Sequence, residues 1–129
     1  MPDTAFQSIT SRQSWYAAEK LDTYYAAEYD AAGQLIKATG ARPFAGIVQY
    51  GCEAADQMVT VVKGSFPALG SEDIDAGDLL TVDSAAAGKF RVADTAGDVV
   101  YGVALTSATT GNLFTISLND IAKTIPSQG

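Results

Sequence analysis

The sequence predicts an all-β fold, a small β-barrel or sandwich made of two related β-meander halves and preceded by an extended N-terminal arm. Three observations predict it. Short apolar runs alternate with loops of small and polar residues, glycines at 88, 97, 102 and 111 repeatedly interrupt the C-terminal part, and the pattern of that part also occurs nearer the N-terminus.

Four short apolar runs define the C-terminal part of the chain. They are Leu79–Val82, Phe90–Val92, Val99–Leu105 and Leu113–Leu118. Runs of roughly 4–8 residues bounded by Gly, Ser, Thr and Asp are typical of antiparallel strands, and each is too short for a stable helix. These runs predict a compact β-meander.

The same order of motifs occurs about 55 residues earlier, which indicates an internal duplication. Three blocks match in order: Asp30–Ala38 with Ser84–Ala93, Phe44–Val48 with Val100–Ala104, and Gln57–Val61 with Asn112–Ile116. Chance similarity between Ala/Gly-rich loops is the competing explanation. Two copies of one supersecondary unit would bury their apolar faces together.

The chain is divided into an arm (residues 1–23), a β-domain (24–119, with repeats at about 24–69 and 70–119) and a C-terminal tail (120–129). Ser14 is a candidate cap for a short helix over 15–21, and Tyr24–Tyr29 opens the first strand. Val59–Val62 is expected to end the first repeat, and residues 63–69 are expected to link the copies.

The segment around the single tryptophan is rich in aromatic residues and has two interpretations. Its side chains complete the core of the barrel, or they dock on a neighbouring subunit, since Tyr and Trp are favoured interface residues. Residues 6–25 are therefore the first choice for partner contact. The candidate contact residues are Phe6, Ile9, Trp15, Tyr16, Leu21, Tyr24 and Tyr25.

An acidic loop over 70–78 raises the question of a cation site. Clustered carboxylates suit calcium, but Asp73, Asp75 and Asp78 lack the Asp-x-Asp-x-Asp-Gly spacing and no bidentate Glu follows. A solvated turn before a strand is favoured, so no metal is expected.

The composition argues against catalysis and against nucleic-acid binding. The chain has no histidine, which removes the usual general base, and its single cysteine, Cys52, is expected to be an inert buried thiol. No phosphate-binding or dinucleotide motif occurs, so neither enzymatic activity nor a cofactor is expected. A net charge of −7 with scattered basic residues disfavours nucleic acid as a partner.

The sequence also gives expectations about location. No stretch approaches about 18 consecutive apolar residues, and the N-terminus lacks the basic and apolar regions of a secretory signal. Membrane insertion is therefore not expected, and synthesis in a bacterial cytoplasm is.

Four motifs together resemble the capsid cement, or head decoration, proteins of tailed bacteriophages. They are Ala76–Leu80, Gly88–Phe90, Gly97–Leu105 and Gly111–Ile116, and the likeness covers residues about 24–119. The resemblance implies a β-rich domain with an N-terminal arm, often trimeric, bound to the major capsid protein on the outer surface of the virion. It carries no catalytic residues.

The resulting expectation is a structural protein that stabilises the shell by bridging coat subunits, with many weak contacts giving high avidity. The alternative from another class is a head-fibre or carbohydrate-binding β-module, which exposed Trp and Tyr on the domain face would favour.

Overall fold

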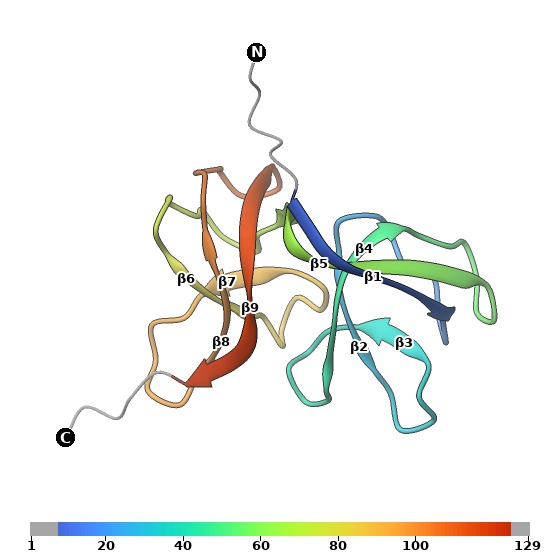
Figure 1. The fold of residues 1–129 in the computed structure, drawn as a ribbon. Helices are drawn as coiled ribbons and strands as arrows, with labels where there is room; N and C mark the ends of the chain where they lie inside the picture. Colours follow the sequence, from blue (N-terminus) through green and yellow to red (C-terminus); the bar gives the residue numbers. More distant parts are fainter. Residues whose placement is uncertain (1–7, 125–129) are drawn as a thin grey trace, which may run out of the picture.

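The computed structural model describes residues 8–124, with side chains described from Ile9 to Leu118 (Figure 1). It is all-β, as predicted, and no helix occurs in this part of the chain. The strands are β1 (Ser8–Tyr16), β2 (Ala26–Tyr29), β3 (Leu35–Lys37), β4 (Phe44–Tyr50), β5 (Met58–Leu69), β6 (Leu79–Val82), β7 (Phe90–Val92), β8 (Val99–Ala104) and β9 (Leu113–Thr124).

The strands form one curled sheet with the order β3-β2-β4-β5-β9-β8-β6-β7, and β1 pairs with β5. All strand pairs are antiparallel. The order reads the same outward from the β5–β9 contact, because β4, β2 and β3 on one side correspond to β8, β6 and β7 on the other. Figure 1 shows these two groups of strands side by side.

The predicted duplication is therefore present in the topology, and it extends further than the sequence blocks. The first half consists of β1 to β4 with the start of β5, and the second half consists of the end of β5 with β6 to β9. Ala17 forms a parallel β-bridge with Leu35 in the first half, and Gly70 forms a parallel β-bridge with Phe90 at the equivalent position of the second half. Each bridge joins the two ends of a curled sheet. Strand β1 thus corresponds to the C-terminal part of β5.

Three segments differ from the sequence-based expectation. Residues 8–16, expected to belong to an arm, form β1 of the same sheet, and the helix expected over 15–21 is absent because Tyr16 still pairs with Met58. Residues 63–69, expected to be a linker, continue β5, where Ser65–Leu69 pair with β9. The segment 119–124, assigned mostly to a tail, is the end of β9.

Two glycines explain how the strands of each half approach so closely. A Cβ on Gly46 would lie 2.5 Å from the Val62 carbonyl oxygen, and a Cβ on Gly102 would lie 2.4 Å from that of Ser117. Only glycine permits such an approach between neighbouring backbones. The shared constraint accounts for the Gly in both copies of the matching block.

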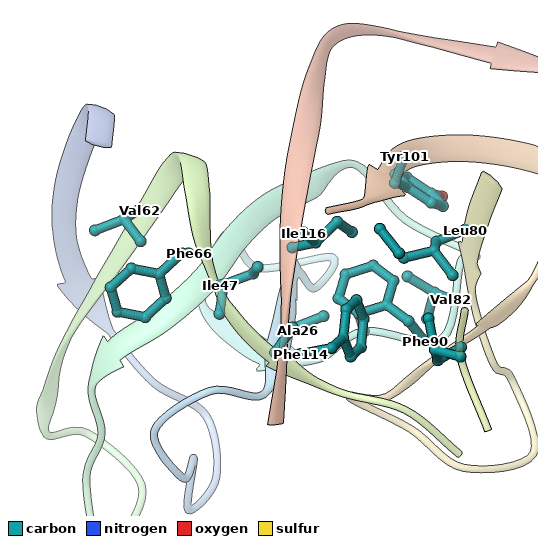
Figure 2. Close-up of a cluster of buried hydrophobic side chains, with 14 residues drawn as sticks. Ala26, Ile47, Val62, Phe66, Leu80, Val82, Phe90, Tyr101, Phe114 and Ile116 are labelled. Carbon is teal, nitrogen blue, oxygen red and sulfur yellow. The ribbon is translucent and has the colours of Figure 1, made fainter. Parts of the chain in front are cut away.

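The core consists of two clusters. The larger one joins both halves, and Figure 2 shows Phe90 and Phe114 at its centre, with Ile47 and Val62 contributed from the first half and Phe66 from the part of β5 that pairs with β9. The smaller cluster lies within the first half and contains Ala17, Leu21, Ala27, Leu35, Ala45, Val48, Cys52, Val59 and Val61. Burial of these side chains in both clusters is the main stabilising contribution.

The turn between β6 and β7 locks the two halves together. The Ala26 amide donates to the Gly88 carbonyl at 2.8 Å, and the Gly88 amide donates to the Ala38 carbonyl at 2.9 Å. One peptide of the second half is therefore inserted between two residues of the first. The ring of Tyr25 lies directly against Gly88, since a Cβ there would come within 2.3 Å of the ring.

Candidate functional site

Four large side chains at one end of the first half are exposed and form the aromatic patch. Their exposed fractions are 48% for Trp15, 46% for Tyr16, 64% for Tyr50 and 52% for Met58. Single exposed apolar residues are ordinary, but a group of aromatic and thioether side chains is typical of a contact surface. The patch is the candidate partner-binding site.

Strand register brings the patch together from three strands. Tyr16 on β1 lies opposite Met58 on β5, and Tyr50 on β4 lies opposite Thr60, two residues further along the same face of β5. Directly opposed side chains are about 5 Å apart and diagonal ones about 7–8 Å apart. The Trp15 ring meets the Tyr16 ring edge-on, with 5.6 Å between centroids.

Polar contacts hold the strands beneath the patch. The Arg12 Nε donates to Gln49 Oε1 at 2.8 Å, which links β1 to β4 across β5, and the Ser14 and Thr60 hydroxyls share a hydrogen bond of 2.9 Å between the neighbouring strands β1 and β5. These contacts fix β1 on β5, so the patch is presented by a sheet rather than by a loose segment.

The second half provides an internal comparison for the patch. At the positions equivalent to Tyr16, Tyr50 and Met58 it has Leu69, Thr106 and Leu113, and Leu69 lies opposite Leu113 as Tyr16 lies opposite Met58. The same scaffold therefore forms without aromatic side chains on this face. Because the fold does not require them, the aromatic residues of the first half point to binding.

The structure places the seven predicted contact residues in different environments. Trp15 and Tyr16 are in the aromatic patch, and Phe6 lies outside the described residues. Ile9 is partly buried against the larger cluster, whereas Leu21 is fully buried in the smaller one, where it is unavailable to a partner.

The two remaining predicted residues pack at the junction of the halves. Tyr24 is half-buried, with its ring 5.9 Å from that of Phe66. Tyr25 lies against Gly88, and the ammonium of Lys37 lies 5.9 Å from the centre of its ring. Both fit the interpretation in which the aromatic segment completes the core.

The sequence analysis did not single out Tyr50 and Met58, because they are distant from Trp15 and Tyr16 in the sequence and lie on other strands, β4 and β5. The duplication carried a signal for one of them. Tyr50 stands where the second copy has Thr106, and an aromatic residue that replaces a small polar one between two copies marks a difference in surface rather than in core.

A shallow open hollow of about 510 Å³ lies at the equivalent end of the second half. Its lining residues are Asp73, Ile74, Asp75, Ser107, Ala108, Thr109, Asn112 and Leu113. It includes two acids of the loop considered above for a cation. The hollow has no aromatic side chain in its lining.

The carboxylates of the acidic loop make hydrogen bonds with the protein itself. Asp73 accepts from the Thr110 amide and hydroxyl, which lowers the pKa of its carboxyl. Asp78 accepts from the Asp75 amide, and Glu72 accepts from the Val92 amide. Among the described residues no group of three or more His, Cys, Asp or Glu side chains is arranged to hold a metal ion.

Two further residues are part of the core. Cys52 is buried in the smaller cluster, and its thiol donates to the Glu19 carbonyl at 3.5 Å. Glu28 is buried as well, and its carboxylate accepts from the amides of Thr39 and Gly40 and from the Thr39 hydroxyl. Both side chains serve the fold.

The part of the chain that the structure describes has no helix long and apolar enough to cross a membrane.

Comparison with known proteins gives a match in structure. The chain resembles the N base of head fiber gp8.5 of bacteriophage phi29, with a TM-score of 0.65 and 17% sequence identity, over 84% of this chain and 95% of that one. This likeness shows a shared fold. No protein-family model matches the sequence, and no match emerges from the curated proteins.

Proposed function

We propose that this protein is a structural component of a bacteriophage virion that attaches to the outside of the head. The observation that carries the proposal is the fold shared with the phi29 head-fiber base over 84% of this chain and 95% of that one. The motifs that resemble head decoration proteins point to the same place on the virion.

The role proposed on the head is stabilisation of the shell by bridging major capsid protein subunits. The aromatic patch supplies the contact, with Tyr16, Tyr50 and Met58 on one face and Trp15 beside them. The Tyr and Trp side chains combine large contact area with little loss of side-chain entropy. A chain without histidine and with a surface of this kind favours binding over catalysis.

The second candidate is the base of a head fibre. It is favoured specifically by the phi29 comparison, because the neighbour is itself the base of such a fibre. A cement protein needs only the shell as its partner, whereas a fibre base also holds a distal part. If this protein, once bound to the shell, also binds a distal fibre protein, the second candidate is favoured.

Co-sedimentation with purified undecorated heads tests the proposal. Deleting residues 1–23 would remove β1 and the buried Ala17 and Leu21, so substitutions are used instead. The variant Trp15→Ala, Tyr16→Leu, Tyr50→Thr, Met58→Leu gives the patch the residues of the second half. Leu113→Thr, at the end of the second half, is the control.

The wild type and the control should bind saturably, and the patch variant should bind at least about tenfold more weakly. Failure of the wild type to bind any mature head would contradict the proposed attachment. Equal binding by wild type and patch variant would keep the attachment and move the contact elsewhere.

A further inference from the structure

One outer face of the first half is buried because the second half covers it. Ala26 on β2 and Ile47 on β4 lie opposite each other in the sheet, and both are fully buried within the larger cluster. The turn that carries Gly88 bonds to the backbone of Ala26 at the edge of this face. The face is an interface inside one chain.

The second half carries the same face, and there it is uncovered. Leu79 and Val103 are paired as Ala26 and Ile47 are, but Leu79 is 46% exposed and Val103 is only partly buried. Leu105, which directly follows β8, is 43% exposed. We call Leu79, Val103 and Leu105 the second-half face, and Ala93 beside it is buried. The second-half face stays apolar although nothing in the described chain covers it.

The backbone of this face also repeats the docking position. In the first half, the Ala38 amide donates to the Ala26 carbonyl. The Ala26 amide does not donate back to the Ala38 carbonyl, because Gly88 lies between them and bonds to both groups. In the second half, Ala93 donates to the Leu79 carbonyl at 2.7 Å, and no bond from the Leu79 amide to the Ala93 carbonyl is formed within residues 8–124. The Leu79–Ala93 pair thus has the same single bond as the Ala26–Ala38 pair, with no peptide of the described chain inserted.

The duplication identifies the segment that fits there. The turn equivalent to the one carrying Gly88 is the β2–β3 turn, residues 30–34, in which Ala31, Ala32 and Gly33 are exposed. Gly33 has a φ of 85°, against 86° for Gly88. Its amide already donates to the Asp30 carbonyl at 3.0 Å, so of the two contacts that Gly88 makes only the one through the carbonyl could be repeated by Gly33.

We propose that the second-half face binds the β2–β3 turn of a second copy of this chain, with the Leu79 amide donating to the Gly33 carbonyl of that copy. The face and the turn lie on different parts of the molecule, so the contact is head-to-tail and generates a closed ring or an open chain of copies. The proposal stands on the duplication and does not depend on attachment to a phage head.

Sedimentation velocity of the purified full chain over a concentration series tests this contact in the absence of heads. Leu79→Glu places a charge on the face, and Ala32→Arg places one on the turn. Leu113→Glu, at an equally exposed leucine away from the face, is the matched control. Circular dichroism melts check that each variant folds.

The wild type and Leu113→Glu should self-associate, and Leu79→Glu and Ala32→Arg should each weaken the association at least about tenfold. Mixing the two weakened variants should restore a dimer, because one intact face then meets one intact turn. A wild type that stays monomeric would overturn the proposal. So would association lost in Leu79→Glu but unchanged in Ala32→Arg, which indicates face-to-face pairing, or association that survives both changes.

Discussion

Tyr24 and Gly77 occupy the same place in the two halves and share one backbone conformation. Their φ angles are 76° and 95°, and their amides donate to the carbonyls of Val48 and Ala104, each at 2.8 Å. The turn before β2 and the turn before β6 therefore both require a left-handed residue. In the first half the position holds a tyrosine, for which this conformation is strained, and its ring packs on Phe66.

Gly77→Ala should destabilise the protein by about 1 kcal/mol, because a Cβ in the left-handed region is strained. No atom lies within 4 Å of that Cβ, so the cost is one of backbone conformation alone. Urea unfolding measures it. Ala76→Ser, on the neighbouring exposed residue, should change stability by less than about 0.5 kcal/mol. Equal stability of Gly77→Ala and wild type would contradict the left-handed assignment.

Gly88→Ala should cost far more than Gly33→Ala, although both glycines have nearly the same φ. A Cβ on Gly33 meets nothing, whereas one on Gly88 would overlap the Tyr25 ring. The difference between the two variants isolates the contact between the halves, and we expect about 1–3 kcal/mol from the overpacking. Thermal melts at low protein concentration measure both. Similar losses in the two variants would show that the turn does not lock the halves.

Glu28→Ala should destabilise the protein by about 2–4 kcal/mol, since it leaves two backbone amides and one hydroxyl at residues 39 and 40 without their acceptor. Glu28→Gln should cost less, because one amide oxygen still accepts. Glu53→Gln, on an exposed side chain, is the charge-matched control. Chemical unfolding of the three variants checks the order. A Glu28→Ala variant as stable as the control would contradict the role of this carboxylate.

Stability should fall in acid partly through Asp98. The side-chain hydrogen bond from Arg91 lowers the pKa of this carboxyl from its ordinary 3.8, and the two groups form an ion pair of 3.0 Å. Because the carboxyl of Asp98 has a lower pKa in the folded protein than in the unfolded chain, its ionised form stabilises the fold fully at pH values above 3.8. This stabilisation is lost as the pH falls from 3.8 through the lower pKa of the folded state.

Asp98→Asn should therefore be less stable than wild type by about 1 kcal/mol at neutral pH, allowing for partial exposure of Arg91. The difference should vanish as the pH falls well below 3.8. Asp94→Asn removes the same charge from an exposed neighbour and should change stability little. Unfolding curves at several pH values test this, and a difference that is constant with pH would contradict it.

Much of the second half could be predicted closely from the sequence, because β6, β7 and β8 are short apolar runs between turns, whereas the ends of β5 and β9 were expected to be a linker and a tail. Leu79–Val82 and Phe90–Val92 were predicted with the bounds that the structure has. The duplication was visible because both copies keep a glycine where a strand crosses a neighbouring carbonyl, at Gly46 and Gly102.

Strand β1 could not be predicted in the same way. Its sequence is mostly polar, and its identity as a strand comes from pairing with β5 rather than from an apolar pattern. The C-terminal part of β5 was obscured by Gly64 and Pro67, which usually mark loops. Pro67 is nevertheless paired with Thr115 in the sheet.

The candidate site was predictable only in part for a similar reason. Trp15 and Tyr16 stood out as adjacent aromatics, but Tyr50 and Met58 join them only through strand register. Leu21 looked equivalent to them in sequence, and its burial follows from an antiparallel bridge to Cys52 that the sequence does not reveal. Tertiary pairing, not local pattern, decides which of these side chains reach the surface.

The most direct test of the proposed attachment is a cryo-EM reconstruction of phage heads incubated with the purified protein. The account predicts density for the β-domain on the outer surface, with Trp15, Tyr16, Tyr50 and Met58 turned toward the coat subunits. Heads that show no added density after incubation with excess protein would contradict the account. Bound protein whose aromatic patch faces solvent would also contradict it.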